Sequence, residues 1–269
     1  MFQHTVDRAS QISPAAHRIT VVGRDHIREA QSQLGTARAG KVISQPKNCD
    51  TAAGIFLALT HVRAHDPNAT VVLFPSDHFV YPEEKFIEVV KTAAQAAREM
   101  EHWIFLLGVS PSAPEPDFGW IELGYHLAWI NGYRVLATKE FLEKPSRDHC
   151  HRAMANGALW NTLVLAVRSE TLWKIGWTCF PELMQLFEAY GEAIGTPDEL
   201  SVLEAIYEVM PSRSFSRHLL EQVPSQVAAI EMKGVLWCDW GRAERILETL
   251  SYLGKQPSFS LARAAGCTS

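Results

Sequence analysis

Two kinds of hydrophobic pattern alternate along the first part of the chain. Apolar residues run together with almost no polar interruption at 71–74 and 103–109, which is typical of strands buried on both faces of a sheet. Residues 52–64 and 83–100 instead repeat apolar positions at helical spacing. This alternation of strand and helix predicts an α/β fold with a mostly parallel sheet and right-handed crossovers.

The pattern changes after a proline-rich segment, 110–118, which predicts a loop. Residues 119–124 and 133–141 alternate in polarity, so we expect an antiparallel pair of strands there. Residues 2–9 have helical periodicity with no capping residue before them, which indicates the end of a helix. The remaining pattern predicts strands at 18–23, 41–44, 158–166, 227–232 and 235–241, and helices at 24–34, 147–156, 170–175, 181–193, 197–210 and 243–252.

Composition narrows the class of protein. The chain has 269 residues, 47% of them hydrophobic, which suits one large α/β domain over residues 1–254. The polar tail at 255–269 is predicted to be disordered. A net charge of −5 without a long basic run argues against nucleic acid as the main partner, because a phosphate backbone demands clustered Lys and Arg.

Other features bear on location. No apolar run approaches the length of about 20 residues that a membrane span needs, and the first ten residues are polar, unlike a signal peptide. The five cysteines are scattered and never form C-x-x-C, which argues against a disulfide framework or a zinc site. We therefore expect a cytoplasmic protein with no membrane partner.

Asp77 is the first candidate for chemistry. It follows the run at 71–74 and Pro75, between Ser76 and His78. Ligands of open α/β sheets bind beyond the carboxyl ends of the strands, and a carboxylate there suits Mg²⁺. An Asp in this position is also a common helix N-cap, and the stretch alone leaves both interpretations open.

Asp239 is the second candidate. It lies between Trp237 and Trp240 and precedes Gly241. An acid among aromatic residues is costly unless it is paired or bound to a metal. Asp77 and Asp239 could therefore share one Mg²⁺ that bridges phosphate oxygens.

Three further candidates have structural alternatives. The amides and Lys47 before the helix at 52–64 could contact a phosphate or a base at the helix N-terminus, although a capped turn is the commoner arrangement. Glu143 and Lys144 could bind a sugar hydroxyl and a phosphate, or belong to a solvated turn. Asn161, in an apolar strand, is either a structural hydrogen-bonding group or a ligand contact.

Six segments occur in the order typical of one enzyme family and together cover roughly residues 2–253. They are 45–52, 74–78, 118–121, 141–145, 159–162 and 237–241. Each is weak alone, but in this order the chain resembles the sugar nucleotidyltransferases, and within them the mannose-1-phosphate guanylyltransferases. The resemblance implies a Rossmann-like mixed, mostly parallel sheet flanked by helices, of the nucleotide-diphospho-sugar transferase type.

The resemblance also implies a reaction. The oxygen of a sugar 1-phosphate attacks the α-phosphate of a nucleoside triphosphate, and pyrophosphate leaves; GTP and mannose 1-phosphate, giving GDP-mannose, are favoured. By position, Asp77 and Asp239 would hold Mg²⁺ and, with Lys144, act in catalysis. The nucleotide would contact Gln45, Pro46, Asn48, Thr51, Ser76 and Asp77, and the sugar phosphate would contact Gly119, Glu143, Lys144 and Asn161.

The start of the sequence departs from the family pattern. Members begin with a strand and a Gly-rich loop that wraps the triphosphate, whereas this sequence opens at the helix that should follow. We therefore expect the first strand to be missing and the sheet to have an open edge or groove. Two functions stay open: an active enzyme, or a truncated inactive relative that binds a sugar nucleotide or serves as an interaction module. A homo-oligomer is compatible with either.

Overall fold

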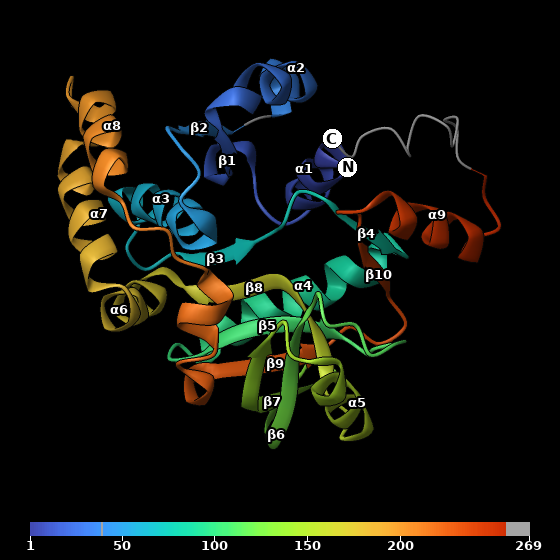
Figure 1. The fold of residues 1–269 in the computed structure, drawn as a ribbon. Coiled ribbons are helices and arrows are strands. Elements are labelled where there is room, and N and C mark those ends of the chain that lie inside the picture. The colour runs from blue at the N-terminus through green and yellow to red at the C-terminus, as the bar shows by residue number, and fades with distance from the viewer. Residues whose placement is uncertain (39, 257–269) are drawn as a thin grey trace.

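The computed structural model describes residues 1–38 and 40–256, and the strands in this part form one large and two small sheets (Figure 1). The large sheet has six strands in the order β3 (Thr70–Leu73), β8 (Leu159–Arg168), β5 (Ile104–Val109), β9 (Val227–Glu231), β7 (Tyr133–Glu143) and β6 (Gly119–Ile130). The small sheets pair β1 (Ile19–Gly23) with β2 (Lys41–Gln45), and β4 (His78–Tyr81) with β10 (Leu236–Asp239).

The prediction of an α/β fold is confirmed, but the prediction of a mostly parallel sheet is wrong. Within the large sheet β5 and β9 are parallel, while β8 is antiparallel to β3, β5 and β6, and β7 is antiparallel to β6 and β9. An apolar run reports burial and not strand direction. The sheet is therefore mixed, because β8 and β7 each run opposite to their neighbours, whereas β5 and β9 run in the same direction.

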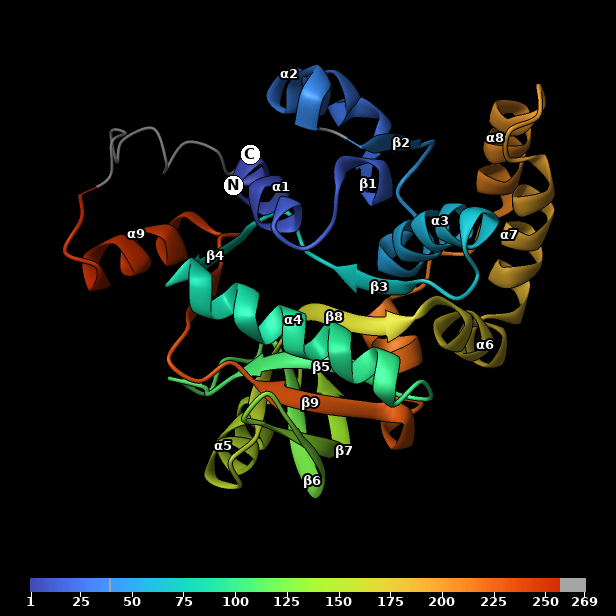
Figure 2. The ribbon, with the colours of Figure 1, turned by 180° about the vertical axis from the view of Figure 1, so that it is seen from behind.

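Helices cover both faces of the large sheet. The helices in the described part of the chain are α1 (Phe2–Ser10), α2 (Ile27–Arg38), α3 (Asp50–His65), α4 (Glu83–Glu99), α5 (Arg147–Ala155), α6 (Ser169–Cys179), α7 (Pro181–Ala193), α8 (Glu199–Val209) and α9 (Ala243–Tyr252), with short 3₁₀- or π-helical segments η1 (Ala15–His17), η2 (Arg24–His26), η3 (Ser216–Leu220) and η4 (Pro224–Gln226). Along β5, Ile104 and Leu106 join the core formed with α3, α6 and α7, whereas Phe105 and Leu107 join the core formed with α4 and α5. Figure 2 shows α4 lying across this second face.

The hairpin of β6 and β7 is longer than predicted. The two strands pair from Gly119 opposite Glu143 to Ile130 opposite Tyr133. Asn131 and Gly132 connect them with positive φ angles of 51° and 79°. Two successive residues in this region give a turn whose twist matches that of the strands, so the pairing extends to the tip.

The N-terminal strands stand apart from the large sheet. Among the described strands, β1 pairs with β2 and β3 pairs with β8, so the sheet is interrupted between β1 and β3. Residues 257–269, most of the segment predicted to be disordered, lie outside the described residues. Within the described part, no helix is both long and apolar enough to span a membrane.

Candidate active site

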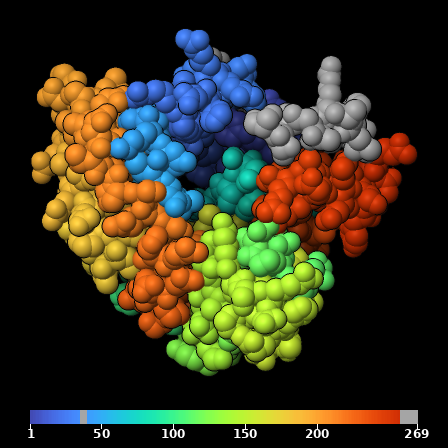
Figure 3. Space-filling model, viewed as in Figure 1, coloured from blue at the N-terminus to red at the C-terminus, as the bar shows by residue number. Residues whose placement is uncertain are grey.

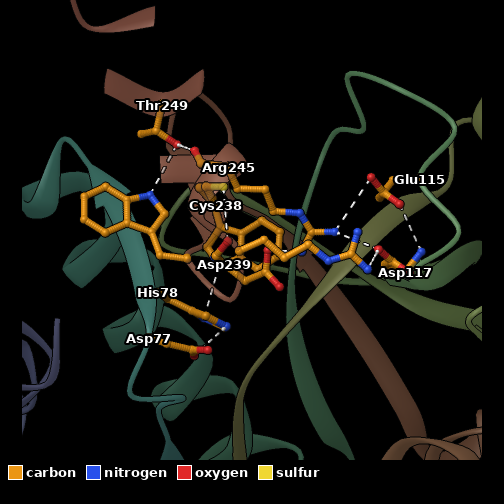
Figure 4. A network of polar contacts seen from close by, with 11 residues as sticks. Asp77, His78, Glu115, Asp117, Cys238, Asp239, Arg245 and Thr249 are labelled. Carbon is orange, nitrogen blue, oxygen red and sulfur yellow. Dashed lines mark hydrogen bonds and ion pairs between the residues drawn. The ribbon is translucent and has the colours of Figure 1, made fainter. Parts of the chain in front are cut away.

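The pairing of β4 with β10 brings Asp77 and Asp239 to the same place. Asp239 stands opposite His78 in this antiparallel pair, and the Trp240 N–H donates to the carbonyl oxygen of Asp77 over 3.0 Å. Figure 4 shows both carboxylates within one network of polar contacts. The two acids that the sequence singled out are thus neighbours in space.

His78 lies next to Asp77, with its ring on the buried side. Its ring is buried, and Nδ1 accepts from the Nε1–H of Trp237 over 3.2 Å. Nε2 therefore carries the proton, and it lies 3.8 Å from Oδ1 of Asp77. Burial lowers the pKa of His78 to about 4, although the charge of Asp77 acts in the opposite direction. The ring is consequently neutral at neutral pH.

Helix α1 fixes the segment that carries Asp77. The buried guanidinium of Arg8 donates to the carbonyl oxygen of His78 over 2.8 Å and to Glu83 over 3.1 Å. Thr5 donates from its hydroxyl to the carbonyl oxygen of Ser76 over 3.3 Å. Sequence reasoning missed these roles of Arg8 and Thr5, since both look like ordinary polar positions of a helix.

Asp239 is half-buried and is paired with Arg245, a residue that the sequence did not single out. Nη1 of Arg245 donates to Oδ1 of Asp239 over 2.5 Å. Burial raises the pKa of Asp239, the Arg245 guanidinium lowers it, and the charges of Asp77 and Asp117 raise it. The expectation that this acid needs a partner is therefore met within the chain.

The carboxylates of Asp77 and Asp239 supply oxygen ligands of the kind that Mg²⁺ takes. Mg²⁺ is commonly bound by one or two carboxylates together with phosphates and water. Among the described residues, no group of three or more His, Cys, Asp or Glu side chains is arranged to hold a metal ion. The donor set of Asp77 and Asp239 therefore suits a cation shared with phosphate and not an all-protein metal centre.

A second cluster joins three of the predicted sugar-phosphate residues. Gly119 stands opposite Glu143 across β6 and β7. A Cβ atom at Gly119 would lie 3.1 Å from Oε2 of Glu143 and 3.4 Å from Cβ of Asn161. The absence of a side chain at Gly119 thus lets the carboxylate and the amide approach the same space.

Glu143 is held by a partner that the sequence did not reveal. Its backbone N–H donates to Oε1 of Glu221 over 2.5 Å. Burial raises the pKa of Glu143; Lys144 and Arg217 lower it, and Glu221 and Asp50 raise it. The charge of Asp50, at the start of α3, thus acts on a carboxyl at the end of β7.

Asn161 lies on a bulge of β8. The register between β5 and β8 shifts after Leu106, and Oδ1 of Asn161 accepts from the backbone N–H of Leu163 over 3.0 Å. Leu163 has a positive φ angle of 55°, which the bulge requires. The side-chain oxygen of Asn161 is therefore a structural hydrogen-bonding group, which was one of the two alternatives for this residue.

An open pocket of about 470 Å³ lies at the start of α3. Its lining includes three of the predicted nucleotide residues and is made by Gln45, Asn48, Asp50, Thr51, Gly54 and Ser212. Figure 3 shows a hollow where the segments near residues 45 to 50 approach the segment near residues 70 to 80. The other three predicted nucleotide residues, Pro46, Ser76 and Asp77, are not among the residues that line the pocket.

The helix start at this pocket is already capped. The N–H of Asp50 donates to Asn48 over 2.9 Å, that of Thr51 to the Asp50 side chain over 2.6 Å, and that of Ala52 to the carbonyl oxygen of Arg213 over 3.0 Å. These three donors are occupied, so a phosphate cannot use them without displacing their partners. The pocket is better suited to a base or a ribose.

Residues 1–256 match the family described as Nucleotidyl transferase. The chain belongs to this family. It is 29% identical to the xanthan biosynthesis protein XanB of Xanthomonas campestris pv. campestris over 175 residues, which are 63% of this chain and 35% of that protein. It is 23% identical to a mannose-1-phosphate guanylyltransferase of Klebsiella pneumoniae over 232 residues, 84% of this chain and 48% of that protein. The chain thus spans between a third and a half of these relatives.

Solved structures share the fold of this family member. A Thermus thermophilus protein named mannose-1-phosphate geranyltransferase matches with a TM-score of 0.79 at 22% identity, covering 94% of this chain and 69% of that one. A Helicobacter pylori protein named mannose-6-phosphate isomerase matches with a TM-score of 0.72 at 19% identity, covering 88% and 90%. The names differ although the fold is the same, so substrate and reaction must be argued from the site.

Proposed function

We propose that this chain transfers a nucleotidyl group from GTP to mannose 1-phosphate, giving GDP-mannose and pyrophosphate. The observation that carries the proposal is the pairing of β4 with β10, which sets Asp77 beside Asp239. Family membership favours nucleotidyl transfer. The relatives named mannose-1-phosphate guanylyltransferases favour these two substrates.

The reaction needs positioning and charge neutralisation more than covalent chemistry. An oxygen of the sugar phosphate forms a bond to the α-phosphorus of the triphosphate, and the bond from that phosphorus to the bridging oxygen breaks. The electron pair of the broken bond leaves with pyrophosphate. Asp77 and Asp239 would hold Mg²⁺, which when bound neutralises charge on phosphate oxygens.

The remaining residues would orient the two substrates. The pocket lined by Gln45, Asn48 and Thr51 would take the base or ribose. Glu143 would accept a hydrogen bond from a sugar hydroxyl beside Gly119, where the backbone leaves room. Lys144, directly after the same strand, would place an ammonium charge near the sugar phosphate.

Pyrophosphate release by the 269-residue chain tests this proposal. The chain would be supplied with Mg²⁺, with mannose 1-phosphate or glucose 1-phosphate, and with GTP, ATP, UTP or dTTP. We expect release above background, with kcat/KM for GTP and mannose 1-phosphate about tenfold or more above the other pairs, because a built pocket discriminates by at least that factor.

Two results would overturn the proposal. Binding of GDP-mannose without release from any pair would identify a sugar-nucleotide-binding module instead of an enzyme. Release with a different base or sugar at higher kcat/KM would retain nucleotidyl transfer but reject the proposed substrates.

A further inference from the structure

Arg245, in the first turns of α9, contacts three carboxylates at once (Figure 4). Its Nη1 lies 2.5 Å from Oδ1 of Asp239, and its Nη2 lies 3.3 Å from Oδ2 of Asp117 and 3.7 Å from Oε2 of Glu115. The guanidinium also lies 4.4 Å from the centre of the Phe118 ring. Only 12% of the side chain is exposed, so this is an enclosed cation and not a solvated surface charge.

Arg242, three residues before Arg245, contacts the same acidic loop but is exposed to solvent. Nη2 of Arg242 lies 2.6 Å from Oδ2 of Asp117, and 61% of its side chain is exposed. Among the ion pairs of the described residues, Arg245 is the cation on Asp239. The two arginines therefore share Asp117, but Arg245 is the enclosed one and contacts Asp239, whereas Arg242 is largely exposed.

The backbone of α9 is held independently of the Arg245 side chain. The hydroxyl of Thr249 donates to the carbonyl oxygen of Arg245 over 2.7 Å and accepts from the Trp240 Nε1–H over 3.3 Å. The Trp240 ring is stacked on Phe79 with 4.9 Å between the ring centres. None of these contacts uses the guanidinium of Arg245.

We propose that Arg245 is a built-in counter-cation of Asp239, which a divalent cation must displace from that carboxylate. A guanidinium and a metal ion on the same carboxylate repel each other, so the metal ion binds Asp239 most favourably when the guanidinium has moved away from Oδ1. Asp117, Glu115 and Phe118 retain the guanidinium when Asp239 is taken, so displacement does not leave it unpaired. The free chain consequently binds a divalent cation weakly, and phosphate oxygens of a nucleotide supply the missing affinity. This inference rests on the proposed role of Asp77 and Asp239.

Mn²⁺ titration of the chain without substrates, with free Mn²⁺ measured by electron paramagnetic resonance, tests the inference apart from turnover. We expect Arg245→Gln to bind Mn²⁺ about tenfold or more tightly than the unaltered chain, because a charge-assisted hydrogen bond no longer competes. Arg242→Gln is the matched control and should bind as the unaltered chain does. Arg245→Lys keeps the charge without the planar fork and should lie between the two.

The outcomes separate this inference from the proposed function. Equal or weaker Mn²⁺ binding by folded Arg245→Gln, with binding still abolished by Asp77→Asn, would overturn the role of Arg245 alone. Binding that survives in Asp77→Asn and Asp239→Asn would reject the metal site itself. If Arg245→Gln does not fold, Arg245→Lys decides: affinity equal to that of the unaltered chain overturns the inference.

Discussion

At the scale of the residue, the pKa of Glu143 leads us to expect that affinity for the sugar phosphate depends on pH. Burial raises the pKa of this carboxyl. The charged acceptor is therefore lost as the pH falls through a value above that of an ordinary glutamate, and if Glu143 binds the sugar as proposed, affinity for the sugar phosphate should fall with it. Glu143→Gln should raise the KM for sugar 1-phosphate about tenfold to a hundredfold while the KM for the nucleotide changes little.

Initial rates at varied sugar phosphate and pH provide the check. In Glu143→Gln the acidic decline in sugar-phosphate affinity should become smaller, because only the phosphate group still titrates. Glu140→Gln, an exposed position on the same strand, is the control. A variant of Glu143 with an unchanged KM for sugar phosphate would exclude this residue from the sugar site.

Single residues were predictable where their type is unusual for their surroundings. Asp77 after a buried strand, Asp239 between tryptophans and Asn161 in an apolar strand all stand out in the sequence. Arg8 and Arg245 do not, because an arginine in an amphipathic helix normally belongs to the solvated face. Their burial arises from tertiary contacts with β4 and with the loop at Asp117, which no local pattern specifies.

At the scale of the element, a chain of hydrogen bonds ties β2 to two helices. Nζ of Lys41 lies 3.0 Å from Nδ1 of His61, and Nε2 of His61 lies 2.9 Å from the Tyr190 hydroxyl. An ammonium group can only donate, so Nδ1 accepts and Nε2–H donates to Tyr190. Burial, followed by the charge of Lys41, lowers the pKa of His61 to about 4.

This network predicts a loss of stability in acid. The folded pKa of about 4 lies below the value of about 6.5 expected in the unfolded chain, so the unfolded state binds more protons between these values. The free energy of unfolding should therefore fall as the pH falls from about 6.5 to about 4, by up to roughly 3 kcal/mol for this group. His61→Gln should reduce the slope of the unfolding free energy against pH. A slope should remain in this variant, because the pKa of His78 is also lowered in the folded chain.

Urea unfolding at several pH values measures this slope. His126→Gln, at an exposed position of β6, provides the control and should leave the slope unchanged. The same slope in His61→Gln as in the unaltered chain would show that His61 is not buried in its neutral form.

Elements were predictable where apolar runs are long. The predictions for β5 and α4 agree with the structure to within about a residue at each end. Strand β4 was not predicted, because it has only four residues and follows Pro75 by a short turn. The direction of a strand could also not be predicted from the hydrophobic pattern, because β8 would have the same apolar run in either direction.

At the scale of the whole molecule, the candidate site forms where distant segments meet. The connection after β3, the strand pair β4 and β10, the start of α3 and the ends of β6 and β7 each contribute to it. The order of six motifs predicted the family correctly, because that order fixes the fold that brings them together. The interruption between β1 and β3 leaves this arrangement of Asp77 and Asp239 intact.

A double-mutant cycle on pyrophosphate release tests the central claim, that Asp77 and Asp239 act as one site. Asp77→Asn and Asp239→Asn should each lower kcat/KM about a hundredfold or more, and the double variant should lose no more than the worse single one, since groups that act as a unit are not additive. Glu84→Gln, an exposed carboxylate on α4, should have no effect. Losses that multiply in the double variant, or single variants that retain full activity, would contradict a shared site.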